Sequence, residues 1–150
     1  MRIVSISEDK KVEKRIAITP DIAKKYIALE LEISLPENYG EHLGFKDSEF
    51  KELGVKISKD EKEIINSADI IVQLGLLSDD KISLLKKNQN LVGILDPYTN
   101  KKKLDNLVKD NVNSFSLDLL PRITRAQSMD ILSSQANLAG YKAVIESFAN

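Results

Sequence analysis

The side chains best suited to chemistry in this 150-residue sequence lie close together near its C-terminus. Arg122 and Asp130 can form a charge-assisted pair across a turn that leads into a helix. Gln127 offers an amide there, and either Ser133 or Ser134 offers a hydroxyl. Arg is scarce, with four Arg against 18 Lys, and its planar guanidinium can hold a carboxylate or carboxamide through two hydrogen bonds. The segment therefore has groups that can recognise a polar ligand.

A structural interpretation of the same residues stays open. Polar side chains are common at helix starts, and an Asp in the first turn interacts favourably with the helix dipole, so Arg122 and Asp130 can also form an ion pair that only caps a helix. The shortage of charge favours recognition instead, because Asp130 and Lys142 are the only groups expected to be charged between Ala126 and Val144. A polar but largely uncharged surface suits a ligand or partner better than water.

Composition excludes several other kinds of site. The chain has no Cys and one His, so disulfides, thiolate chemistry, zinc clusters and His-based triads are not available, and no metal is expected. A net charge of −1 argues against binding of nucleic acid through its phosphates. The sequence has no window approaching the ~18 consecutive apolar residues of a membrane helix and no signal peptide at its start, so a cytoplasmic location is expected.

Short apolar runs alternate with helical periodicity along most of the chain. Thr19, Pro20 and Asp21 supply an N-cap, a first-turn proline and a first-turn acid, which predicts a helix to about Leu29. Further helices are predicted over 47–53, 59–68, 81–87 and 101–109, and strands over 2–6, 31–35, 55–57, 69–74, 90–95 and 114–117. This alternation predicts a single α/β domain of the flavodoxin-like or Rossmann-like kind, with an open, mainly parallel sheet and helices on both faces.

The last predicted helix, from about Ala126 to Ser147, is longer than the others. At 100° per residue, its small and apolar side chains fall on one arc and its hydrogen-bonding side chains lie roughly opposite. The first arc comprises Met129, Leu132, Ala136, Ala139 and Ala143, and the second comprises Gln127, Asp130, Ser134, Asn137 and Tyr141. Because small residues let another backbone approach closely, the first arc favours a protein partner or self-association, and a homodimer is expected.

The stretch from Pro121 to Val144 resembles a hallmark segment of the NAD(P) transhydrogenase alpha subunit, in its NAD(H)-binding component. The run Glu13 to Pro20 resembles a start that this family shares with alanine dehydrogenases, and Ala68 to Val72 extends the similarity. The resemblance implies hydride transfer from NADH to NADP⁺, which a separate component holds, and a membrane component that couples the transfer to proton translocation. It thus implies NAD(H) as cofactor, NADP(H) on the partner, and a location peripheral to a membrane-embedded complex.

The same resemblance implies roles for individual residues. Arg122 and Asp130 correspond to an ion pair beside the nicotinamide ribose and carboxamide. Ser133 corresponds to a hydroxyl that helps to orient the dihydronicotinamide, and Gln127 to a residue that reaches toward NADP(H). Hydride transfer needs two rings held close together in a dry cleft and no acid or base from the protein, so the lack of a catalytic His or Cys is no obstacle.

Arg15 raises an alternative activity. In alanine dehydrogenases the matching Arg binds the substrate carboxylate, together with a Lys and a His near the ends of the fourth and fifth strands. Gln73 and Asp96 stand at those places here, which disfavours oxidation of alanine. A structural role for Arg15 stays open.

One motif of dinucleotide-binding proteins is missing, because the sequence has no G-x-G-x-x-G and no phosphate loop. In the family that this chain resembles, the Gly-rich turn lies in a second, Rossmann-type domain that follows the long helix. Residues 1–150 are therefore expected to be the N-terminal half-domain of the NAD(H)-binding component, without the downstream half and with little NADH affinity of their own. The alternative is a truncated, non-catalytic paralogue that acts as an interaction or dimerisation module.

Overall fold

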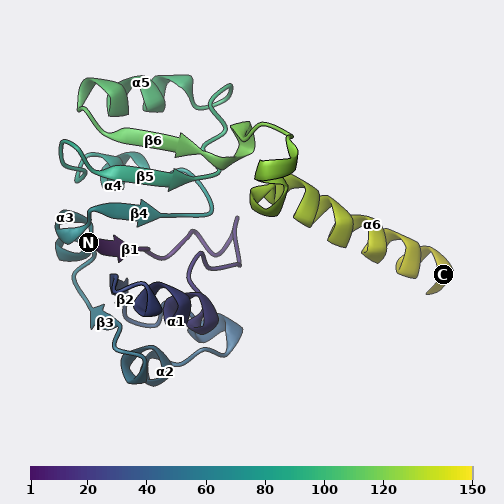
Figure 1. The fold of residues 1–150 in the computed structure, drawn as a ribbon, viewed down its shortest axis with the longest axis horizontal. Helices are drawn as coiled ribbons and strands as arrows, with labels where there is room; N and C mark the ends of the chain where they lie inside the picture. The colour runs from purple at the N-terminus through teal and green to yellow at the C-terminus, as the bar shows by residue number, and fades with distance from the viewer. Residues whose placement is uncertain (150) are drawn as a thin grey trace.

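Residues 1–149 are described by a computed structural model, which contains a six-stranded sheet in the order β3-β2-β1-β4-β5-β6 (Figure 1). The strands are β1 (Arg2–Val4), β2 (Glu32–Pro36), β3 (Lys56–Ser58), β4 (Ile70–Val72), β5 (Asn90–Gly93) and β6 (Asn113–Ser116). The helices are α1 (Pro20–Ala28), α2 (Asp47–Glu52), α3 (Glu61–Ser67), α4 (Asp79–Ile82), α5 (Lys101–Lys109) and α6 (Ile131–Ala149). Each neighbouring pair of strands is parallel, which confirms the predicted α/β sheet.

The direction in which strands are added reverses between β1 and β4. The chain first builds outward from β1 to β3, and α3 then returns it to the other side of β1. Ile3 pairs with Ile70, and Val4 pairs with Ile71. In open parallel sheets, ligands bind in the crevice beyond the carboxyl ends of the two strands at such a switch point. Here that crevice follows Val4 and Val72.

Each face of the sheet has its own apolar core. The core under α1 and α2 contains Ile3, Ile16, Ile18, Ala23, Ile33, Leu35, Tyr39, Phe50 and Val55. The core under α3, α4 and α5 contains Val4, Ile6, Ile64, Ile65, Ala68, Ile71, Leu77, Ile82, Leu91, Leu95, Leu107 and Val112. Because successive strand residues point to opposite faces, the neighbours Ile3 and Val4 belong to different cores. This alternation explains why the strand sequences are apolar on both sides.

The start of α1 follows directly from its sequence. The Thr19 hydroxyl accepts a hydrogen bond from the Ile22 backbone N–H at 3.4 Å, Pro20 is the first helical residue, and Asp21 lies in the first turn. A proline at this position loses no helical hydrogen bond, because the first N–H groups of a helix have no partner inside it. The predicted helix start is confirmed.

The C-terminal helix begins later than predicted. Residues Thr124–Met129 form a 3₁₀ turn, η3, and α6 begins at Ile131. The Asp130 carboxylate accepts hydrogen bonds from the Ser133 backbone N–H at 2.9 Å and from the Ser133 hydroxyl at 2.6 Å. Asp130 therefore caps α6. A residue in this role has a non-helical backbone, which separates η3 from α6 and corrects the prediction of one continuous helix.

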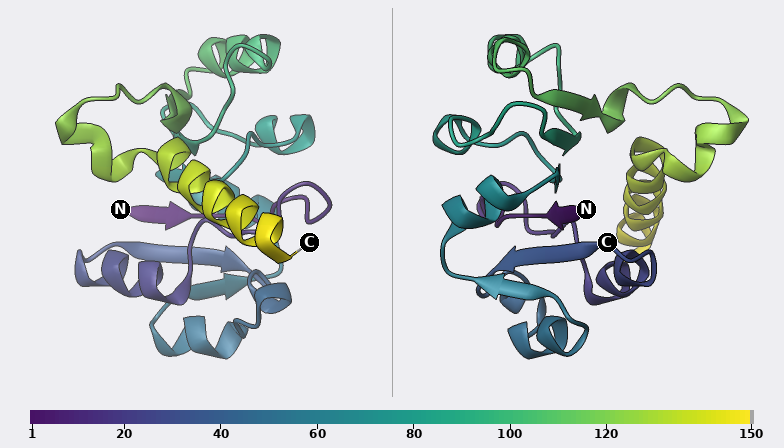
Figure 2. Two further views of the ribbon diagram at one scale, coloured as in Figure 1. Left: turned by 90° about the vertical axis from the view of Figure 1, so that its right-hand side faces the viewer. Right: turned by 60° about the vertical axis from the view of Figure 1, so that its left-hand side comes forward.

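The helix α6 extends away from the sheet, on the side where the strands have their carboxyl ends (Figure 1). None of its residues is buried, and Figure 2 shows the same projecting helix from two other directions. Leu138, Ile145 and Phe148 lie on the side that was predicted to be polar, so the predicted contrast between two arcs is incomplete. Within residues 1–149, no helix is both long enough and apolar enough to cross a membrane.

Candidate functional site

The four residues predicted to act in function lie around one pocket at the start of α6. Its volume is about 380 Å³, and its lining comprises Pro121, Arg122, Ile123, Thr124, Ala126, Gln127, Asp130 and Ser133. The turn η3 forms one wall and the first turn of α6 forms another. Ala126 is the buried residue that anchors η3. Because η3 interrupts the helix, Arg122 and Gln127 can face the same space as Asp130, and we call this space the α6 pocket.

In the α6 pocket, Asp130 is held by Ser133 and not by Arg122. Hydrogen bonds from the Ser133 hydroxyl and backbone N–H lower the pKa of the Asp130 carboxyl, and the charge of Arg122 lowers it further. Among residues 1–149, the ion pairs do not include one between Arg122 and Asp130. The direct pair suggested by the sequence is therefore not formed, because the carboxylate is engaged in capping the helix. The exposed Arg122 guanidinium still faces the pocket.

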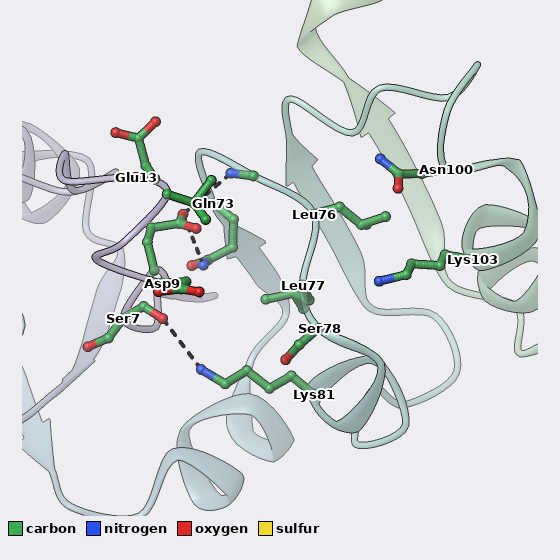
Figure 3. Close-up of a pocket in the computed structure, with 13 residues that line it drawn as sticks. Ser7, Asp9, Glu13, Gln73, Leu76, Leu77, Ser78, Lys81, Asn100 and Lys103 are labelled. Carbon is green, nitrogen blue, oxygen red and sulfur yellow. Dashed lines mark hydrogen bonds between the residues drawn. The ribbon is translucent and has the colours of Figure 1, made fainter.

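A second pocket, of about 640 Å³, occupies the switch-point crevice (Figure 3). The loop after β1 contributes Glu8, the turn after β4 contributes Gln73 and Gly75, and α4 and α5 contribute Lys81 and Lys103. Lys81 Nζ donates to the Ser7 carbonyl oxygen at 3.4 Å, as Figure 3 shows. The Glu and Lys residues of this pocket were not among the site residues predicted from the sequence.

The central acid of the crevice is Glu8, whose Oε1 atom accepts three hydrogen bonds. Their donors are Leu74 N at 2.7 Å, Gly75 N at 3.4 Å and Gln73 Nε2 at 3.2 Å. Burial raises the pKa of the Glu8 carboxyl, and the two backbone N–H groups offset this effect only in part. Glu8 thus ties the loop after β1 to the turn after β4.

A buried polar network lies directly beneath Glu8. Gln73 is buried, and its Oε1 atom accepts hydrogen bonds from the Ser5 hydroxyl and the Ile6 backbone N–H, both at 2.8 Å. The Tyr39 hydroxyl donates to Ser5 Oγ at 2.7 Å and accepts from the Ile18 N–H at 3.2 Å. This network was not predicted from the sequence, where its main signal is a polar Ser or Gln inside an apolar strand run.

The residues that match the alanine dehydrogenase substrate site do not form a carboxylate-binding group here. Arg15 Nη2 pairs with Glu13 Oε2 at 2.6 Å, and its side chain is half exposed. The hydrogen bond from Arg15 lowers the pKa of Glu13. Gln73, at the place of the Lys, is enclosed in the network beneath Glu8. The guanidinium is thus satisfied by an acid of its own loop.

The crevice fits the pyrophosphate of a dinucleotide poorly, although the strand order is that of dinucleotide-binding domains. Such domains bind pyrophosphate at a Gly-rich turn and a helix N-terminus directly after the first strand. Here the loop after β1 contains Glu8, Asp9 and Glu13, and their charges repel an anion. The α6 pocket, with Arg122 and Gln127, instead fits an uncharged carboxamide. Within residues 1–149, no group of three or more His, Cys, Asp or Glu residues could hold a metal ion.

Strand order and site together define an open α/β domain of the dinucleotide-binding type, with a carboxamide-sized polar pocket and an acidic first turn. Comparison with known proteins agrees with this class. The family model described as "Alanine dehydrogenase/PNT, N-terminal domain" matches residues 5–139, and the chain belongs to this family.

Relatives named as transhydrogenases are more similar to the chain than an alanine dehydrogenase is. The first of the NAD(P) transhydrogenase alpha-subunit chains of Rickettsia prowazekii is 43% identical over 150 residues, which are 97% of this chain and 39% of that protein. Alanine dehydrogenase 1 of Staphylococcus aureus is 23% identical over 145 residues, 97% of this chain and 38% of that protein. The crystal structure of transhydrogenase from Sinorhizobium meliloti superimposes with a TM-score of 0.87 at 34% identity, over 96% of this chain and 43% of that chain. The resemblance noted in the sequence is confirmed, and the chain spans less than half of these relatives.

Proposed function

We propose that this chain forms the nicotinamide-facing wall of the NAD(H) site in an NAD(P) transhydrogenase. The observation that carries the proposal is that Arg122, Gln127, Asp130 and Ser133 line one pocket. Greater similarity to transhydrogenases than to an alanine dehydrogenase supports the same function. Alanine oxidation is disfavoured because Gln73 is buried and Arg15 is paired with Glu13.

The residues of the α6 pocket suit binding and orientation. When bound, NADH supplies the hydride. Arg122 and the Gln127 amide can donate hydrogen bonds to a carboxamide oxygen, and the amide oxygen of Gln127 can accept from the carboxamide nitrogen. Because the Ser133 hydroxyl already donates to Asp130, its lone pairs can accept a further hydrogen bond. No residue needs to gain or lose a proton.

Other parts of the proposed complex must complete this site. The acidic loop after β1 does not suit the pyrophosphate, so a second, Rossmann-type half supplies that contact in the proposal. The NADP(H)-binding component meets the α6 pocket at Gln127, and a membrane component couples the transfer to proton movement. On its own, the chain is expected to bind NADH too weakly for calorimetry, and micromolar affinity, corresponding to about −8 kcal/mol, would contradict this division of the site.

A chimera tests the function directly. The segment of the Rickettsia prowazekii relative that matches this chain is replaced by residues 1–150, and the product is combined with its NADP(H)-binding component. We expect hydride transfer from NADH to an NADP⁺ analogue and no NADH-dependent reduction of pyruvate with ammonia. A chimera that binds NADH and reduces pyruvate, but does not transfer hydride to the analogue, would refute the proposal.

Two arginines of the chimera provide a matched pair. Arg122→Lys removes the planar guanidinium from the pocket and is expected to lower turnover roughly 10- to 100-fold, the kinetic equivalent of a lost charge-assisted hydrogen bond. Arg125→Lys changes an exposed neighbour that does not line the pocket, so turnover should stay within about twofold. Equal losses in both variants would show that general charge, and not the geometry of the pocket, is responsible.

A further inference from the structure

One half of one sheet face has no helix over it. Ile70, Val92 and Phe115, on β4, β5 and β6, point to the side opposite the core formed with α3, α4 and α5. With Leu117 and Leu120 they line a groove of about 650 Å³. Phe115 is 55% exposed. We call these five residues the open face.

The opposite end of the sheet shows how this fold treats a face that meets water. On the side turned away from α1 and α2, the residues of β2 and β3 are polar. Lys56 Nζ pairs with Glu32 Oε2 at 3.2 Å, and Ser34 is the register partner of Lys56. Polar strand residues suit a solvated face, and a contiguous apolar patch typically marks a contact surface. The open face therefore has the composition of a covered surface.

A second uncovered surface runs along α6. Leu138, Tyr141, Ile145 and Phe148 are separated by three, four and three residues, a spacing that places side chains on one side of a helix. Tyr141 is 69% exposed and Phe148 is 88% exposed. All four side chains are uncharged. We call them the apolar seam.

We propose that the apolar seam of one chain packs on the open face of a second copy, and reciprocally, so that two chains form a symmetric dimer. Within one chain, η3 and the Asp130 cap direct α6 away from its own sheet (Figures 1 and 2). Both surfaces are uncharged, so their contact buries no unpaired charge. Pairing of α6 with α6 leaves the open face exposed, whereas the reciprocal exchange covers both surfaces.

The available area is large enough for a stable dimer. A buried aromatic side chain contributes about 150–250 Å². With the exposed fractions of Phe115, Tyr141 and Phe148, the two symmetric contacts remove roughly 600–1,000 Å² from water through these aromatic rings alone. That is about half of the ~1,200–2,000 Å² in stable interfaces, and the aliphatic residues of both surfaces add to it.

Light scattering across a concentration series tests the dimer with the 150-residue chain. We expect twice the chain mass of 16.8 kDa, and a strictly monomeric chain at every soluble concentration refutes the proposal. Phe115→Glu and Phe148→Glu should each weaken the dimer roughly 30-fold or more. Both positions are exposed in the single chain, so circular dichroism should stay unchanged. Ala139→Glu, on the small-residue arc, should leave the dimer intact; its dissociation overturns the assignment of the seam.

Disulfide trapping identifies which surfaces meet, because the chain has no Cys of its own. A mixture of Phe115→Cys chains and Ile145→Cys chains should form a disulfide between the two kinds of chain. If Ile145→Cys chains instead link only to each other, α6 pairs with α6 and the proposal fails. It also fails if a chain with both substitutions forms an internal disulfide as a monomer, since α6 then folds back on its own sheet.

Discussion

Replacement of Tyr39 by Phe removes a single oxygen atom from the centre of the buried polar network. The Tyr39 hydroxyl donates to Ser5 Oγ at 2.7 Å and accepts from the backbone N–H groups of Ala17 and Ile18, at 3.1 and 3.2 Å. The aromatic ring keeps its edge-on contact with Phe50, whose centroid lies 6.2 Å away. The substitution therefore isolates the hydrogen bonds from the packing.

The expected loss in unfolding free energy follows from the groups left without partners. Ile18 is fully buried, so its N–H has no access to water, whereas Ala17 is half-buried. Leaving one buried donor unsatisfied costs about 1–3 kcal/mol, and the second, partly hydrated donor costs less. We expect Tyr39→Phe to lower the unfolding free energy by about 2–4 kcal/mol, a large part of the ~5–15 kcal/mol typical of a domain.

Urea unfolding followed by circular dichroism measures this loss, with Tyr98→Phe as the matched control. Tyr98 is 88% exposed, so its substitution should change the unfolding free energy by less than about 0.5 kcal/mol. The dependence on urea should be the same for both variants, because the same surface is exposed on unfolding. The reasoning is refuted if Tyr39→Phe is as stable as the unsubstituted chain.

Three further changes probe other contacts. Hydrogen bonds from Arg2 and Lys56 lower the pKa of the exposed Glu32 to about 2, so its stabilising effect is present above pH 4.5 and is lost as the pH falls toward 2; thermal melts over this range should show a smaller pH dependence for Glu32→Gln. Gly93→Ala places a Cβ 2.6 Å from a backbone oxygen and should cost about 1–3 kcal/mol, whereas Gly140→Ala meets nothing within 4 Å and should stabilise α6 by about 0.5–1 kcal/mol in the same urea assay. Asp130→Ala removes the cap of α6 and should reduce local stability by about 1 kcal/mol, seen as faster amide exchange in its first turn; unchanged exchange would argue against the capping role.

Local sequence determined most of the elements of this protein. Thr19, Pro20 and Asp21 define the start of α1 because a cap, a proline and an acid act on the nearest backbone groups. The apolar strand runs predicted a sheet covered on both faces, and the alternation with helices predicted parallel strands. The grouping of Arg122, Gln127, Asp130 and Ser133 was also predictable, since one short segment contains all four.

Tertiary structure decided what depends on distant partners. The strand order brings Ser5 and Gln73 within 2.8 Å although they are 68 residues apart, and no local pattern encodes that meeting. The competition for Asp130 was also open in the sequence: Ser133 captures the carboxylate because a helix cap forms within one turn, and Arg122 is left facing the pocket. The open face exists because α1 and α2 cover only one end of their side of the sheet, an outcome of chain direction at the switch point between β1 and β4. Neighbouring residues act through short-range backbone chemistry, whereas these features require the whole sheet to assemble.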